Sequence, residues 1–215
     1  MNTTTASIES FRNIIEVSGE GTVAAAPDRA LITLGVVTEK ANLSEAQAEN
    51  AAAVSSILQS LYQLGIPKEK VQTVQYGIDI QYNYKEGVQT FRGYKVTHLL
   101  RVTADKIEQT GVIVDTAVRH GANTVSGVQF TSAHPEAYYH QALTMAVHSS
   151  RQKAATLAKA MGVALHPGPV RIQEVSHGVE PPTYQMATFA AAASTPIQPG
   201  ELNISAAVKA YYSYS

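Results

Sequence analysis

The sequence predicts an α+β fold in which helices pack on antiparallel sheets. Three segments repeat apolar residues every three or four positions, as amphipathic helices do, and others alternate apolar and polar residues, as strands do. From Arg29 to Ser132 the order is strand, helix, strand, strand, helix, strand. That order predicts a ferredoxin-like βαββαβ unit over residues 29–133.

The segment Val17–Val36 begins with Gly19 and Gly21, which raises the question of a phosphate-binding loop. Such a loop needs a third glycine and a helix whose N-terminal amides face the phosphate. Here the chain passes through Pro27–Asp28 into alternation, so we expect two strands joined by a proline-containing connection. The two glycines then serve the backbone rather than a ligand.

Three helices are expected from their end signals, at Ser44–Gly65, Asp105–Gly121 and Pro135–Gly162. The first two begin with a capping box, a polar residue followed three positions later by Gln or Glu. The third begins with proline in its first turn, and all three end at glycine. The expected contact stripe of the third is mostly small: Tyr139, Leu143, Ala146, Ser150, Ala154, Leu157 and Met161.

The remaining regular segments are predicted strands. Val71–Tyr84 places apolar side chains on one face and mainly Gln, Thr, Asp and Asn on the other. We therefore expect the polar face to be exposed to solvent. Residues 85–88, KEGV, predict a hairpin turn, after which Phe91–Ala104 returns. Further strands are expected at Thr124–Thr131, Val170–Ser176 and Leu202–Tyr214, the last as a sheet strand rather than a frayed tail.

Residues 13–28 and 134–215 are predicted to form a smaller second α/β part with an N-terminal strand, the long helix and two C-terminal strands. Because no piece is large enough to be stable alone, they must pair with each other or extend the first sheet, giving one domain of two parts. Within this part Ser176–Glu201 is a proline-rich loop that contains Met186 and Phe189. A loop of this length is either a surface excursion or a segment that binds a protein partner.

The composition excludes several classes of protein. The 215 residues carry a formal net charge of -1 with scattered Lys and Arg, which argues against nucleic-acid binding. The absence of cysteine excludes disulfides and thiolate chemistry. No apolar run reaches the ~20 residues of a membrane span. The N-terminal residues do not form a secretory signal, so we expect a cytoplasmic protein, or a periplasmic or cell-envelope protein if the chain is a processed form.

The sequence offers no residue set for catalysis or metal binding. None of the seven histidines lies two, three or four residues from another, which is the spacing that places two rings on one ion. There is no Gly-x-Ser-x-Gly motif, which marks a common class of serine hydrolase. We therefore expect a non-enzymatic protein with no cofactor and no metal.

The aromatic residues suggest an interface or a cleft. Eleven tyrosines accompany four phenylalanines and no tryptophan, and tyrosine is enriched at interfaces because it buries area while keeping a polar tip. Tyrosines at the ends of a sheet fit equally well. The candidate residues are Tyr76, Tyr82, Tyr94 and His98, and His98 is expected to be a hydrogen-bonded core or interface histidine. Unpaired sheet edges predict a homo-oligomer.

Five segments in this order resemble the SIMPL-domain family, a domain of unknown function: SGEGTVAAAPDRALITLGV, LGIPKEKVQT with a tyrosine-rich hairpin ending in YKVTHLLRV, VDTAVRHGANTVSGVQF, ALTMAVHSSRQKAATLAKAMG and PIQPGELNISAAVKAYY. The resemblance runs from about Val17 to Tyr212. It implies bacterial relatives, usually with a secretion signal that this chain lacks, a link to oxidative stress, and self-assembly into rings. It supplies no catalytic residues.

Together, the residues and the resemblance lead us to expect a non-enzymatic protein that acts through self-assembly and protein interaction, in a stress response. The alternative is a small-molecule or stress-related binding protein with its site in a cleft between the two parts.

Overall fold

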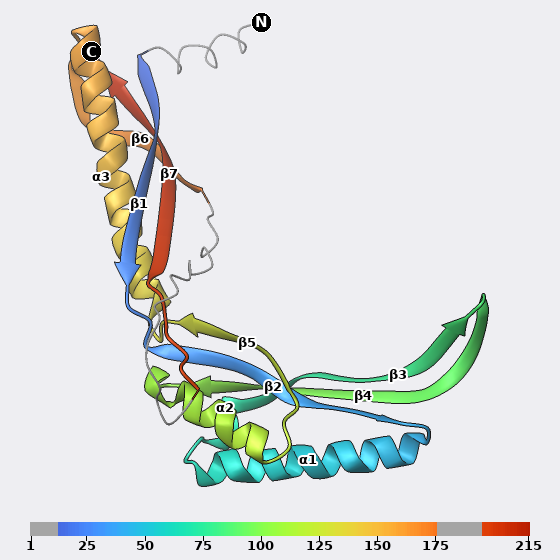
Figure 1. Ribbon diagram of the computed structural model, residues 1–215. Coiled ribbons are helices and arrows are strands. Elements are labelled where there is room, and N and C mark those ends of the chain that lie inside the picture. The colour runs from blue at the N-terminus through green and yellow to red at the C-terminus, as the bar shows by residue number, and fades with distance from the viewer. Residues whose placement is uncertain (1–12, 176–194) are drawn as a thin grey trace, which may run out of the picture. The chain divides into compact units, whose positions relative to one another are not determined.

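The computed structural model describes residues 13–175 and 195–215. It confirms the predicted α+β fold, with helices packed on two antiparallel sheets. The chain divides into two compact units. The ferredoxin-like unit holds residues 27–133 and 195–200, and the long-helix unit holds residues 13–26, 134–175 and 201–215 (Figure 1).

The ferredoxin-like unit has the predicted element order. It contains β2 (Arg29–Lys40), α1 (Leu43–Gln63), β3 (Val71–Lys85), β4 (Val88–Ala104), α2 (Thr110–Arg119) and β5 (Thr124–Thr131). The strand order in the sheet is β3-β4-β2-β5, and each neighbouring pair is antiparallel. Strands β2 and β3 therefore run in the same direction with β4 between them, which is the split βαβ arrangement. Figure 1 shows α1 and α2 on the same side of this sheet.

The core of this unit lies between the sheet and the two helices. Alternate residues of β2 and β4 meet the buried stripes of α1 and α2, because each strand turns every second side chain toward the helices. The largest fully buried side chains of the cluster are Ile32, Leu34, Val36, Ile57, Leu61, Leu100, Val102 and Ile113.

Helix α1 is capped by Asn42 and not by Ser44, so the predicted start was wrong. The Asn42 side chain accepts hydrogen bonds from the backbone N–H of Ser44 at 2.8 Å and of Glu45 at 3.4 Å. Asn and Ser are comparable N-caps, and here the earlier of two neighbouring polar residues takes the role. The helix ends before Gly65, whose φ of 89° suits glycine.

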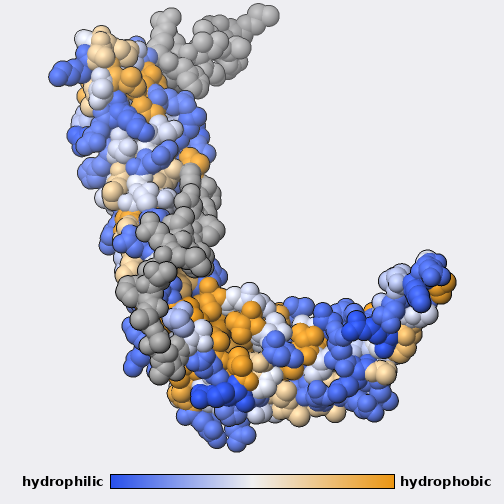
Figure 2. Space-filling view, viewed as in Figure 1, coloured by the Kyte–Doolittle hydropathy of each residue, from blue (hydrophilic) through white to orange (hydrophobic). Residues whose placement is uncertain are grey.

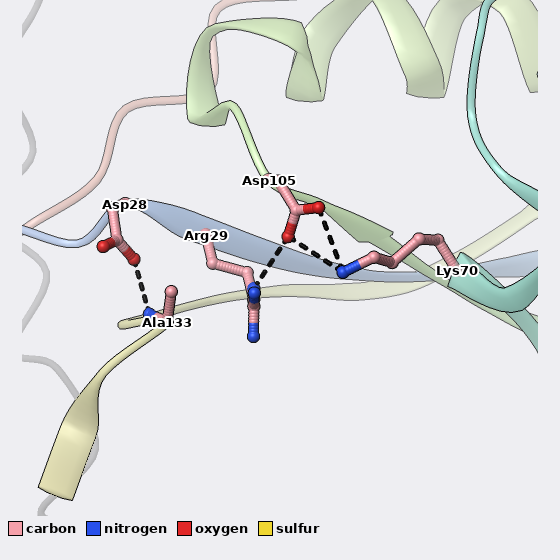
Figure 3. Close-up of polar contacts among 5 residues, drawn as sticks. All are labelled: Asp28, Arg29, Lys70, Asp105 and Ala133. Atoms are coloured by element: carbon pink, nitrogen blue, oxygen red, sulfur yellow. Dashed lines mark hydrogen bonds and ion pairs between the residues drawn. The ribbon is translucent and has the colours of Figure 1, made fainter.

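Asp105 does not cap α2, which corrects the second predicted helix start. A short 3-10 turn at Ile107–Gln109 leads into α2 instead. The Asp105 carboxylate, just after β4, lies 3.0 Å from Arg29 Nε and 3.0 Å from Lys70 Nζ (Figure 3). Arg29 begins β2 and Lys70 directly precedes β3. These two cations thus hold the carboxylate away from the helix.

We expect Asp105→Asn to weaken the ferredoxin-like unit slightly. The Lys70 hydrogen bond is the main cause that lowers the pKa of Asp105, with Arg29 contributing. A lowered native pKa contributes stability above the unfolded pKa, and this is lost as pH falls through the native value. Urea unfolding at neutral pH should show a loss of less than about 1 kcal/mol, because the pair is half-exposed. The loss should vanish in acid, and a loss that persists there would contradict the ion-pair explanation.

The same end of the sheet carries a second carboxylate contact. Asp28 Oδ1 accepts a hydrogen bond from the backbone N–H of Ala133 at 2.6 Å (Figure 3). The backbone N–H of Asp28 also donates to the carbonyl of Thr131. Asp28 therefore joins the chain just before β2 to the chain just after β5.

The long-helix unit packs one helix on a three-stranded sheet. It contains β1 (Ile14–Ala25), α3 (Pro135–Met161), β6 (Leu165–Val175) and β7 (Leu202–Tyr214), with strand order β1-β7-β6 and antiparallel pairs. As predicted, α3 begins with proline, and Gly162 ends it with a left-handed φ of 72°. The C-terminal strand is also confirmed, and its buried face consists of Leu202, Ile204, Ala206, Val208, Ala210 and Tyr212.

The contact stripe of α3 is narrower than predicted. Its buried residues are spaced by four: Ala142, Ala146, Ser150, Ala154 and Ala158. Leu157 and Met161 are 45% and 53% exposed, so their predicted place in the stripe was wrong. The helix lies directly on two glycines of β1, because a Cβ on Gly19 would lie 2.0 Å from the carbonyl oxygen of Ala146. The predicted backbone role of Gly19 is thus a close helix–strand contact.

Candidate functional site

Among residues 13–175 and 195–215, the two sheets have four edge strands, and three of them carry features that hinder pairing with another chain. On β1, Lys153 Nζ donates to the carbonyl of Ser18 at 2.9 Å and occupies an edge acceptor. Strand β6 contains Pro167 and Pro169, which have no N–H to donate. Strand β5 has only 8 residues, and its register with β2 is irregular near Gly127. Such devices are the usual protection of sheet edges.

Strand β3 is the fourth edge and the least protected. It has 15 residues and no proline, and within the described parts of the chain it pairs only with β4. An edge strand points alternate N–H and C=O groups away from its neighbour, so β3 offers a long row of backbone donors and acceptors. The ladder skips one residue of β3, Val74, while its second irregularity places the extra residue, Arg92, on β4. Gln75–Lys85 is therefore an unbroken extended segment of β3.

The apolar face of β3 is also uncovered. Helices α1 and α2 pack over β2 and β4 and leave the outer strand open. Val71, at the start of β3, packs against the core. The apolar residues that follow it are between 39% and 74% exposed: Val74, Tyr76, Ile78, Ile80, Tyr82 and Tyr84. Both faces of β3 are therefore exposed to solvent: the polar face, as predicted, and the apolar face as well.

The far end of the β3–β4 hairpin extends beyond the rest of the sheet. Strand β2 ends opposite Tyr94, so the part of the hairpin beyond it is a two-stranded ribbon. Its turn is Glu86–Gly87, and both residues have positive φ, as in a tight hairpin turn. Figure 2 shows hydrophilic residues over much of the hairpin and a hydrophobic patch at its end. A two-stranded ribbon is only marginally stable by itself, so this segment gains from a further strand.

His98 of β4 lies beside the start of the apolar face of β3. Its Nε2 lies 3.0 Å from the Thr73 hydroxyl, and its ring meets Tyr76 edge-on with centroids 5.2 Å apart. Gln47 of α1 donates to the Tyr76 hydroxyl at 3.3 Å. Burial lowers the pKa of His98, which favours the neutral ring at neutral pH. His98 thus has a hydrogen-bond partner, as predicted, and Tyr76 contacts both His98 and α1.

The structure places four of the six predicted site residues on this hairpin. Tyr76 and His98 touch each other, and Tyr94 packs edge-on against Phe91 with centroids 5.3 Å apart. Tyr82 lies six residues from Tyr76 along β3, which is about 20 Å. The four residues therefore line an extended surface and do not converge on one small molecule. Met186 and Phe189 lie outside the described residues.

Residues 195–200, near the end of the predicted 176–201 loop, belong to the ferredoxin-like unit. Thr195 donates from its backbone N–H and from its hydroxyl to the Asp115 carboxylate, at 3.0 and 2.5 Å. These bonds lower the pKa of Asp115, and Ile197 packs against the core. Thr195 lies 80 residues from Asp115 in the chain, and the charge of Arg119 makes a smaller contribution to the lowered pKa.

Two further findings concern the described part of the chain. Its residues form no group of three or more His, Asp or Glu side chains arranged to hold a metal ion. None of its helices is both long and apolar enough to cross a membrane.

These features define an α+β protein with a ferredoxin-like unit, a long-helix unit and one open hairpin edge. The chain belongs to the SIMPL family, described as a protein of unknown function (DUF541), whose model matches residues 15–212. The resemblance found in the sequence is therefore confirmed.

Relatives of the chain come from several bacteria. The chain is 34% identical over 158 residues to a 26 kDa periplasmic immunogenic protein of Brucella abortus (strain S19), covering 70% of this chain and 62% of the relative. It is 26% identical over 152 residues to the uncharacterized protein YggE of Edwardsiella ictaluri, covering 70% and 64%. The chain thus spans less than two thirds of the length of these relatives.

Proposed function

We propose that this SIMPL-family protein acts without catalysis, by associating with further copies of itself through the outer edge of β3. The observation that carries the proposal is that β3 combines an unprotected edge of 15 residues with an exposed apolar face. Strand addition supplies affinity through backbone hydrogen bonds and specificity through alternate side chains. Both components are available on β3.

The proposal also explains two other properties of the hairpin. A third strand would stabilise the two-stranded ribbon beyond β2, which is marginal by itself. It would also bury Ile78 and Ile80, which lie 39% and 51% exposed at the middle of the strand. Burial of such side chains is the dominant favourable contribution in most protein associations.

The test is the solution mass of the chain with a charge placed on β3. Ile80→Lys is expected to convert assemblies to monomers at micromolar concentration, because a lysine in the middle of an edge strand opposes pairing with another strand. Ile172→Lys on β6 is the matched control, since Ile172 is 45% exposed on the edge of the other sheet. A wild-type monomer, or dissociation by Ile172→Lys alone, would contradict the proposal.

The cellular compartment of the protein is proposed from the names of its relatives. Two of them, from Brucella abortus and Brucella melitensis, are named periplasmic proteins, and we propose the same compartment for this chain. A stress role and a protein partner for residues 176–201 stay predictions. A small-molecule site is less favoured, because the candidate tyrosines are spread along the hairpin.

A further inference from the structure

We infer that the β3 strands of two copies pair antiparallel about a two-fold axis at Ile80. This inference rests on the proposed self-association and adds the partner segment and its register. In this arrangement Ile80 lies opposite Ile80 of the second copy, and the two ferredoxin-like sheets form one continuous sheet.

Symmetry limits the possible registers. In an antiparallel pair, directly opposite residues share one face of the sheet. A two-fold axis between identical strands is perpendicular to the sheet, so each face of one copy continues as the same face of the other. One residue at the centre must therefore lie opposite itself. The apolar faces of the two copies then join on one side.

The unbroken part of β3 selects the centre. The irregularity at Val74 interrupts the strand on one side, and the turn at Glu86–Gly87 ends it on the other. The segment between them, Gln75–Lys85, has Ile80 as its midpoint. A centre at Ile78 would place Val74 opposite Tyr82 and break the ladder, and a centre nearer the turn would shorten it.

Charge supports the same register. A centre at Asp79 would place two carboxylates opposite each other, which is destabilising. With the centre at Ile80, Asp79 lies opposite Gln81 and Lys85 lies opposite Gln75. No like charges then face each other along the paired segment.

The apolar side chains are also complementary in this register. The exposed face reads Tyr76, Ile78, Ile80, Tyr82 and Tyr84, which is nearly symmetric about its centre. Tyr76 lies opposite Tyr84, and Ile78 lies opposite Tyr82. Aromatic pairs and aromatic–β-branched pairs are among the favourable cross-strand combinations.

The chain contains no cysteine, so a single introduced cysteine can form a disulfide only with another copy. In Ile80→Cys the two Cα atoms would lie about 4.5–5.5 Å apart, which is within disulfide range. In Ile78→Cys, the matched control on the same exposed face, they would lie about 13 Å apart. Under mild oxidation, non-reducing electrophoresis should show roughly tenfold faster dimer formation for Ile80→Cys.

A mixing experiment tests the flanking pairs. Tyr76→Cys and Tyr84→Cys should cross-link when mixed, and neither should do so alone. The solution mass of each reduced variant is measured in parallel. Assembled protein in which Ile78→Cys links as fast as Ile80→Cys would overturn the register and leave the proposed function intact. Monomeric reduced variants, together with a monomeric wild type, would overturn both.

Discussion

Replacing Gly19 by alanine is expected to lower the free energy of unfolding of the long-helix unit by about 3 kcal/mol. The new Cβ would lie 2.0 Å from the carbonyl oxygen of Ala146, 2.6 Å from the backbone nitrogen of Ser150 and 2.8 Å from its Cβ. These atoms belong mostly to helix backbone and cannot rotate away. Helix α3 would have to lift from β1, and the buried alanine row that follows it would lose contact with the sheet.

Gly168→Ala is the matched control, because Gly168 lies on β6 of the same unit and its Cβ would meet nothing within 4 Å. Denaturant unfolding followed by circular dichroism compares the two variants with the parent. The Gly168→Ala variant should stay within about 1 kcal/mol of the parent. Equal stability of the two variants would show that α3 does not need the close approach at Gly19.

The topology was predictable because local signals set it. Pro135 and Gly162 mark the ends of α3 through fixed φ and left-handed φ, and no distant residue is needed to read them. The alternation of β7 likewise matches its buried face from Leu202 to Tyr212. Element order then determined the ferredoxin-like strand order, since few connections are compatible with it.

The exposed face of β3 was not predictable in the same way. Its alternation is that of a strand with one face on the core, and only the width of the helical layer decides whether an outer strand is covered. The partners of Asp105 and Asp115 depend on the same kind of information, because Arg29 and Thr195 are distant in sequence. Tyr76 and His98 were found as candidates from residue type, whereas their contact required the strand register.

Asn50 is a buried polar residue of α1, and its role depends on contacts that are distant in the sequence. It is only 1% exposed, and its Nδ2 donates to the carbonyls of Val36 on β2 at 3.1 Å and of Val96 on β4 at 3.3 Å. Its Oδ1 is buried and has no hydrogen-bond partner among the described residues. The side-chain amide of Asn50 therefore links α1 to the two central strands, β2 and β4.

Asn50→Asp is expected to destabilise the ferredoxin-like unit by about 3 kcal/mol or more at neutral pH. The change removes both donors and places a carboxylate against two carbonyl oxygens. Burial and these acceptors would raise the pKa of the new group above its unfolded value of about 3.9. The loss is therefore smallest below the unfolded pKa and grows as pH rises toward the native value.

Asn50→Leu separates charge from lost hydrogen bonds, because it removes the donors, keeps a similar volume and does not titrate. Its urea midpoint, relative to that of the parent, should be the same at mildly acidic and mildly alkaline pH. The Asn50→Asp variant should approach it in acid and fall well below it in base, since a protonated carboxyl can still donate one hydrogen bond. Equal midpoints for the two variants throughout would mean that solvent reaches this position and that Asn50 does not tie α1 to the sheet.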